Sequence, residues 1–187
     1  YNSYISPFDT GSNAAASQGS LIDPFHWIQD NYQIGREYAY GLFHFYSGGT
    51  NSDMKEVPED FIENFIRHLI CHEVGHTLGL RHNFKSSTTI SLKDLHNKNI
   101  TGHNGIGNSV MEYLPANIAP KGTIQGDYWN TRVGKWDRLM IEYGYCFLNA
   151  KRPEDELPIL DKIASRTAAP EMTYGTDEDA YDFGRVS

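Results

Sequence analysis

One short pattern constrains this chain more than any other: His-Glu-x-x-His-x-x-Gly-x-x-His, formed by His72, Glu73, His76, Gly79 and His82. Residues four apart lie on one face of a helix, so His72 and His76 can aim two imidazole nitrogens at one point. Gly79 is a suitable end for that helix, because glycine adopts left-handed backbone angles without steric cost. The chain can then turn back and bring His82 to the same point. Three neutral histidines with an open fourth position predict a catalytic zinc site rather than a closed structural one.

Two neighbours of the ligand histidines have different expected roles. Glu73 lies one residue round the helix from His72, close enough to touch a ligand of the ion without being one. His68 lies one turn before His72, and we expect it to be packed or hydrogen-bonded nearby. The alternative interpretation is an amphipathic helix with surface histidines and an incidental carboxylate. That alternative has to treat Gly79 and His82 as coincidences.

Length, charge and hydropathy restrict the classes of partner. The chain has 187 residues, which predicts one domain or one domain with an appendage. Its net charge is −8 and it has no basic stripe, which argues against nucleic acid as a partner. No apolar run approaches the roughly 20 residues of a membrane span, and no signal peptide is visible. The chain opens on Tyr1 rather than Met, so we expect an excised piece or a mature form of a longer chain. The oligomeric state is not indicated.

Periodicity predicts several helices. Residues 24–46 carry an apolar stripe interrupted at Gly35, which indicates one broken helix or two short ones. Pro58 opens the central helix, which runs to about Leu78, and a further amphipathic helix is expected over 129–143. The central helix is expected to pack against the core through an apolar stripe. The residues of this stripe are Ile62, Phe65, Ile66, Leu69 and Ile70.

The C-terminal part is polar. From Ala150 onward the chain is rich in Pro, Glu, Asp and Lys, with a short helix expected over 155–166. The acidic run 176–179 lacks the spacing of a known calcium loop, so we interpret it as a solvated segment. Cys71 and Cys146 are too few for a disulfide framework. Two buried thiols are the preferred interpretation, and a single bridge stays open.

The histidine pattern followed by Met111 resembles the metzincin clan of zinc metallopeptidases, in which a tight turn with a methionine lies beneath the three histidines. Tyr113, two residues past the methionine, is similar to the tyrosine of the astacin and serralysin branches. In those branches the phenol can ligate the metal and then stabilise the reacting carbonyl. Asn83, after the third histidine, departs from the astacin, serralysin and matrix-metallopeptidase patterns.

A closer resemblance covers about residues 58–145. The runs 81–84, 109–113 and 141–145 look most like a large family of secreted bacterial metzincin-like proteins. The resemblance implies an α+β zincin-like catalytic domain with zinc as its cofactor. It also implies a secreted or cell-envelope location.

One departure affects the expected fold. Metzincins place a twisted sheet before the active-site helix, but residues 1–57 show no set of alternating strands. We therefore expect this chain to be mainly helical with long loops, and the upstream sheet to be weak or missing. The expected divisions are an N-terminal segment with aromatic helices at 1–57, a zinc-binding catalytic core at 58–146 and an acidic extension at 147–187.

The function that these features predict is zinc-dependent endopeptidase activity on a protein or peptide substrate. Glu73 would act as general base, Tyr113 would stabilise the oxyanion and Met111 would form an apolar floor. Two alternatives stay open. One is a zinc hydrolase of a non-peptide amide or ester, and the other is a non-catalytic metal-containing module of a larger envelope protein.

Overall fold

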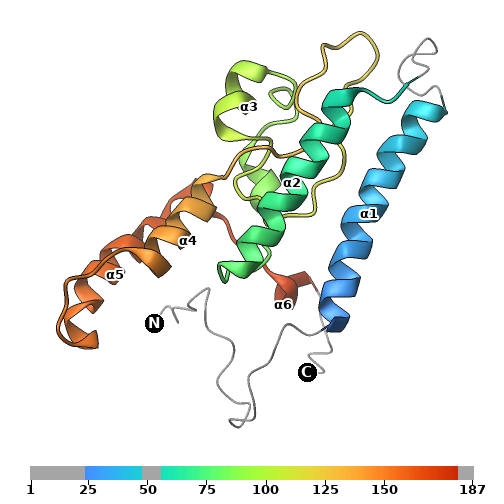
Figure 1. Cartoon of the computed structure of the whole chain (residues 1–187). Coiled ribbons are helices and arrows are strands. Elements are labelled where there is room, and N and C mark those ends of the chain that lie inside the picture. The colour runs from blue at the N-terminus through green and yellow to red at the C-terminus, as the bar shows by residue number, and fades with distance from the viewer. Residues whose placement is uncertain (1–23, 48–55, 181–187) are drawn as a thin grey trace, which may run out of the picture.

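The computed structural model describes residues 24–47 and 56–180, and these residues are mainly helical with long loops, as expected (Figure 1). No strand occurs among them, so the expected α+β class has no sheet to support it in the described part of the chain. Much of the segment 1–57 and the end of the extension 147–187 lie outside this part. The helices are α1 (Pro24–Tyr46), α2 (Glu59–Thr77), η1 (Ser86–Thr89), α3 (Lys98–Asn104), α4 (Lys135–Tyr145), η2 (Pro153–Asp155), α5 (Leu157–Ala164), η3 (Ser165–Ala168), η4 (Pro170–Met172) and α6 (Asp177–Ala180).

The prediction of a broken helix over 24–46 is wrong, because α1 is a single continuous helix. Gly35 is exposed, and a side chain added there would meet no other atom within 4 Å. A glycine in such a position costs only about 1 kcal/mol relative to alanine, which the rest of a long helix can offset. In Figure 1, α1 and α2 lie side by side and run in opposite directions.

The central helix has the predicted limits but buries a different face. Pro58 is its N-cap residue, and Leu78 follows its last turn. The apolar stripe predicted to be buried is largely exposed, with Ile62 at 40%, Ile66 at 49% and Ile70 at 57%. The buried residues of α2 are instead Phe61, His68, His72 and Gly75. Hydrogen bonds to backbone carbonyls allow the two histidines to be buried without the cost of an unpaired polar group.

Two hydrophobic clusters hold the fold together. One joins α1 and α2 to the loop at 128–129, where Trp129 packs edge-on against Phe65 with ring centroids 5.2 Å apart. The other lies beneath the loop at 110–111 and includes Trp136, Leu139 and Met140 of α4. The predicted start of a helix at 129 is therefore wrong. Trp129 belongs to the first cluster, and the chain reaches the second before α4 begins at Lys135.

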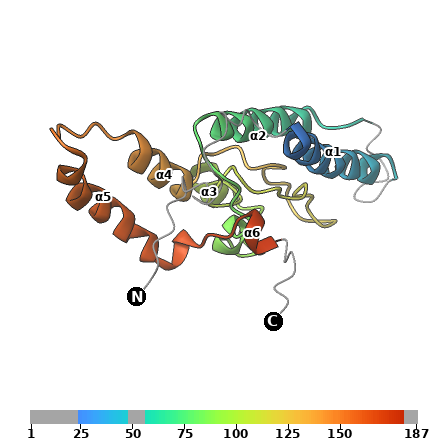
Figure 2. The same ribbon diagram turned by 90° about the horizontal axis from the view of Figure 1, so that it is seen from below.

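Helices α4 and α5 extend away from α1 and α2 (Figure 2). The short helix α5 confirms the expectation for 155–166. Cys71 and Cys146 are both free and half-buried. Among the described residues, no helix combines the length and the apolar character that a membrane crossing requires.

Candidate metal centre

Helix α2 and the turn after it bring the three motif histidines together. His72 and His76 lie one helical turn apart near the C-terminal end of α2. Gly79 then adopts a φ of 84°, the left-handed conformation that was predicted for this position. The Leu80 amide donates to the Gly75 carbonyl at 3.0 Å, which closes the turn. The chain then reverses and brings His82, which is buried, close to His72 and His76.

Hydrogen bonds on the far side of each ring fix its tautomer. Nδ1 of His72 lies 2.8 Å from the Val110 carbonyl oxygen, and Nδ1 of His76 lies 3.0 Å from the Leu80 carbonyl oxygen. A carbonyl oxygen can only accept, so both Nδ1 atoms carry the proton. In a neutral imidazole this leaves the lone pair on Nε2. Tautomers of this kind, fixed by a partner of the second nitrogen, are typical of metal-ligating histidines.

The Nε2 atoms face one another. Those of His72 and His76 are 3.0 Å apart, and one donor atom from each of the three histidines lies within 4.8 Å of the others. Two lone pairs at that distance repel unless a cation or a proton lies between them. A tetrahedral zinc ion with bonds of 2.0–2.1 Å places its ligand nitrogens about 3.3 Å apart. The three histidines therefore fit a single divalent ion.

Burial keeps the central ring neutral. Desolvation is the main reason that the pKa of His72 falls from 6.5 to about 2, and the neighbouring His76 lowers it further. A neutral ring is the form that binds a metal ion. Burial also lowers the pKa of His68 to about 4. His68 stacks on Trp129 and its Nδ1 lies 3.2 Å from the Asn130 carbonyl oxygen, so it is packed near the site without joining the cluster.

The predicted turn with a methionine lies directly under the histidines. Residues 110 and 111 form a turn, and Met111 is 0% exposed. A side chain at Gly75, between His72 and His76, would overlap the Met111 sulfur. The glycine inside the motif thus lets the methionine approach the helix backbone closely. The Asn83 amide also donates to the Met111 carbonyl at 3.0 Å, which joins the turn to the segment that carries His82.

A buried carboxylate holds this turn in place. Asp137 of α4 accepts hydrogen bonds from the Ser109 hydroxyl at 2.5 Å, the Val110 amide at 2.9 Å and the Gly134 amide at 2.8 Å. Burial raises the pKa of Asp137, and these hydrogen bonds oppose that rise. Because the Val110 carbonyl accepts from His72, Asp137 is connected to the metal centre through one residue. The sequence pattern alone gave no sign of this contact.

The other two predicted site residues are Tyr113, on the segment after the turn at Met111, and Glu73, on α2. Tyr113 is half-buried, and its hydroxyl lies 2.5 Å from Nε2 of His82, so it is directly beside a candidate ligand atom. Its ring also stacks on that of His72, with centroids 5.2 Å apart. Glu73 follows His72 on α2 and is half-buried.

The acidic run at 176–179 departs from the expectation of a solvated segment. Asp177 is only partly exposed, and its two carboxylate oxygens lie 3.0 and 3.1 Å from Nδ1 of His82. Burial alone would raise the pKa of Asp177, but the hydrogen bonds that its carboxylate accepts from His82 and Thr176 help to lower it overall. The contact joins residues 95 apart in the chain, and no local pattern around Asp177 predicts it.

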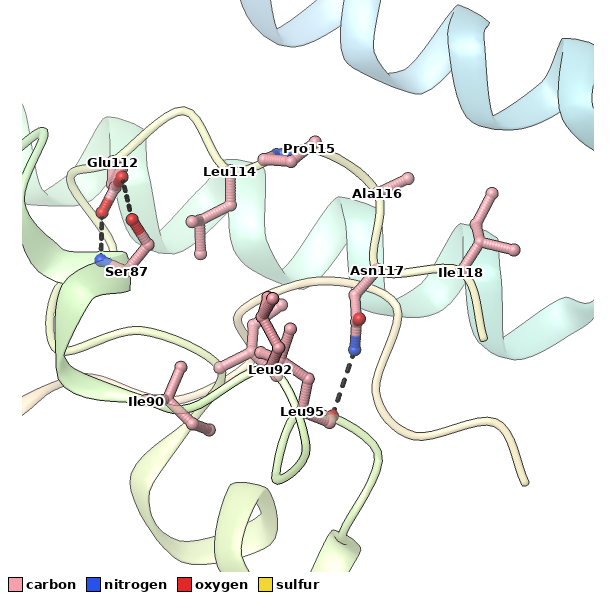
Figure 3. Close-up of a pocket in the computed structure, with 11 residues that line it drawn as sticks. Ser87, Ile90, Leu92, Leu95, Glu112, Leu114, Pro115, Ala116, Asn117 and Ile118 are labelled. Atoms are coloured by element: carbon pink, nitrogen blue, oxygen red, sulfur yellow. Dashed lines mark hydrogen bonds between the residues drawn. The ribbon is translucent and has the colours of Figure 1, made fainter. Parts of the chain in front are cut away.

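A separate apolar pocket of about 330 Å³ lies behind the segment that carries Tyr113 (Figure 3). Glu112 and Leu114 line it, whereas Tyr113 between them contacts His82. The pocket and the three histidines therefore lie on opposite sides of one segment. Leu114 points toward Leu92 and Leu95 across the pocket.

The polar groups that line this pocket are paired within the protein. The Glu112 carboxylate accepts from the Ser87 amide at 2.6 Å and from the Ser87 hydroxyl at 2.7 Å. The Asn117 amide group donates to the carbonyl oxygens of Leu95 and Asp127. The remaining lining is mostly aliphatic, so the pocket suits an apolar group rather than a charged one.

Comparison with known proteins gives one match. A family model described as Met-zincin matches residues 54–186, which is well over half of the chain. The match includes α2, the turn at 110–111 and the segment that contains Asp177. No curated protein and no solved structure matches the chain.

Proposed function

The chain belongs to the Met-zincin family, and on that premise we propose that it is a zinc-dependent endopeptidase. The observation that carries the proposal is the convergence of three Nε2 lone pairs, from His72, His76 and His82, with a glutamate next to the first of them. A purely structural site has no need of a carboxylate at that position. The Met-zincin match supports the same class of chemistry.

In this proposal His72, His76 and His82 hold the ion, and Met111 packs beneath the rings as an apolar floor. A bound zinc ion supplies Lewis acidity and makes a water molecule acidic at neutral pH. Glu73 would act as general base toward that water molecule and would pass the proton to the leaving amine nitrogen. The proposal is supported by the three histidines, whose ligand atoms lie within 4.8 Å of one another.

Tyr113 stabilises the oxyanion in this proposal. Its hydroxyl now lies 2.5 Å from the His82 lone pair. With the His82 lone pair committed to a metal ion, the Tyr113 hydroxyl would be able to donate its hydrogen bond to a substrate carbonyl instead. A donor aimed at the oxygen where charge develops lowers the barrier of acyl transfer. The expected protein or peptide substrate and the secreted or cell-envelope location remain predictions.

The proposal is tested with zinc-loaded protein and a fluorescently labelled, denatured protein as substrate. We expect new amino termini to appear, and 1,10-phenanthroline to stop the reaction while its non-chelating 1,7 isomer does not. The Glu73→Gln variant should retain its zinc and lose about 100- to 10,000-fold in rate. Full turnover by this variant, or turnover that the chelator does not affect, would refute the proposal. Hydrolysis of small esters alone would favour a non-peptide hydrolase, and no hydrolysis at all would favour a non-catalytic module.

A further inference from the structure

We propose that Asp177 is a positioning residue of the metal centre, which holds the His82 ring in the orientation that zinc binding requires. The segment 173–177 is then a structural part of the centre. This inference rests on the proposed zinc site but not on peptidase activity.

The third histidine differs from the other two in how its ring is held. His72 and His76 lie on α2, and each donates Nδ1–H to a backbone carbonyl. His82 lies beyond the end of the helix, where no helical backbone fixes its ring. Its Nδ1 instead faces the Asp177 carboxylate, with both oxygens within 3.1 Å. A carboxylate can only accept here, so the proton is on Nδ1 and the Nε2 lone pair faces the other histidines.

Hydrogen bonds of the backbone and of the Asn83 side chain attach the Asp177 segment to the segment that carries His82. The Phe84 amide donates to the Gly175 carbonyl at 2.7 Å, and the Gly175 amide donates to the Asn83 side-chain oxygen at 3.3 Å. The Asn83 amide group in turn donates to the Thr173 carbonyl at 3.1 Å. Asn83 is fully buried, so its side chain acts as a fixed bridge between the two segments.

A solvent-exposed ion pair lies beside Asp177, and ion pairs of this kind contribute little to stability. The Arg81 guanidinium donates to both carboxylate oxygens of Glu178, at 2.6 and 2.5 Å. The same guanidinium lies 3.9 Å from the Asp177 carboxylate, which it does not hydrogen-bond. The Asp177 carboxylate is therefore held by the His82 ring and by the Thr176 hydroxyl, which donates to it at 3.3 Å, rather than by Arg81.

The chemistry of the pair favours metal binding. A carboxylate that accepts from the outer nitrogen of a ligand histidine fixes the ring and raises the basicity of the inner nitrogen. Three neutral histidines leave the charge of a divalent ion uncompensated, and Asp177 supplies one negative charge next to the ligand shell. Glu178 carries the same charge one residue away, but its carboxylate accepts from Arg81 and not from one of the three histidines, so it provides a matched control.

The test compares Asp177→Ala, Asp177→Asn and Glu178→Ala with the wild-type protein, without any substrate. The zinc dissociation constant is measured by competition with a chromophoric chelator, and the thermal unfolding of each metal-free protein is recorded alongside. We expect Asp177→Ala to weaken zinc binding about 10- to 100-fold. Asp177→Asn keeps an acceptor oxygen and loses the charge, so its zinc affinity should fall between those of the wild type and Asp177→Ala. Glu178→Ala should bind zinc as the wild type does.

A second readout separates positioning from general stability. In the cobalt-substituted protein, the visible absorption bands report the ligand geometry, and we expect them to change in Asp177→Ala but not in Glu178→Ala. Wild-type zinc affinity in Asp177→Ala would overturn the inference, and so would equal weakening by Glu178→Ala. If the affinities follow the expected order and the zinc-loaded wild-type protein cleaves no peptide, the positioning role stands and the peptidase proposal fails.

Discussion

Each histidine of the proposed centre donates a hydrogen bond from Nδ1–H to a different acceptor. These acceptors are the carbonyl oxygens of Val110 and Leu80 and the carboxylate of Asp177. The rings are therefore oriented by the protein before any ion binds. Pre-orientation of this kind lowers the ordering cost of metal binding, because fewer side-chain rotations are lost on binding.

At the same scale, we predict that the hydroxyl of Tyr113 contributes to catalysis and not to zinc affinity. Tyr113→Phe should lower kcat/KM about 100- to 1,000-fold, as removal of an oxyanion donor does. Its zinc dissociation constant should equal that of the wild type. The matched control is Tyr145→Phe, which loses a hydrogen bond to the Leu78 carbonyl and leaves the centre untouched. Steady-state kinetics would contradict the prediction if Tyr113→Phe turned over peptide at the wild-type rate.

The sequence predicts the site residues unequally. His72 and His76 are spaced by the helix and His82 by the glycine after it, so local rules place all three near one point. Asp177 lies 95 residues beyond His82, and its contact depends on tertiary structure that no local pattern encodes. Asp137 was missed for the same reason.

At the scale of elements, local sequence signals predict where α2 begins and ends but not which of its faces is buried. Pro58 and Gly79 mark its ends in the sequence and in the structure. The aliphatic stripe suggested the wrong buried face, because hydropathy does not account for histidines whose nitrogens are hydrogen-bonded inside the protein. Gly35 suggested a break in α1 that the structure does not have, because one exposed glycine costs too little to end a long helix.

The glycines of the two long helices provide a prediction about packing. Gly75→Ala places a methyl group on the Met111 sulfur, so it should destabilise the metal-free protein by about 1–3 kcal/mol. Gly35→Ala meets no atom within 4 Å and should stabilise the protein by about 0.5–1 kcal/mol. Urea denaturation of both variants gives the two free energies of unfolding. Equal stability of the two variants would show that Met111 does not need the glycine.

At the scale of the whole molecule, acid should destabilise the metal-free protein. Burial lowers the pKa of His68 to about 4, compared with 6.5 in the unfolded chain. Between these values the unfolded chain binds a proton that the folded chain does not, so the free energy of unfolding decreases as the pH falls from 6.5 to 4. At about 1.4 kcal/mol per pH unit, the decrease is about 3 kcal/mol. That decrease is the contribution of His68 alone, and His72, whose pKa is about 2, adds a decrease of the same sign over the same range and continues it to lower pH.

The contribution of His68 is isolated with the His68→Gln variant, which keeps a donor for the Asn130 carbonyl. Its free energy of unfolding should depend less steeply on pH between 4 and 6.5 than that of the wild type, and the two slopes should agree above 6.5. Denaturant titrations at a series of pH values measure both slopes. Identical slopes over the whole range would mean that His68 is not buried in its neutral form.

The fold as a whole was predictable only in outline. Local patterns identified the helical character and the central helix, because these depend on residues close in the chain, and the family resemblance identified the turn at Met111. They did not predict how α4 and the segment 173–177 pack around the histidines. Those contacts depend on which carbonyl and carboxylate oxygens accept hydrogen bonds from donors far away in the sequence. Hydrophobic periodicity carries no information about that pairing.

The central claim is that His72, His76 and His82 bind one zinc ion through Nε2. X-ray absorption at the zinc edge of the protein loaded with one equivalent tests it most directly, with His82→Ala measured beside the wild type. The account predicts three imidazole nitrogens and a further oxygen at about 2.0–2.1 Å, and the loss of one imidazole in the variant. A sulfur ligand at about 2.3 Å, or a wild-type spectrum from His82→Ala, would contradict it.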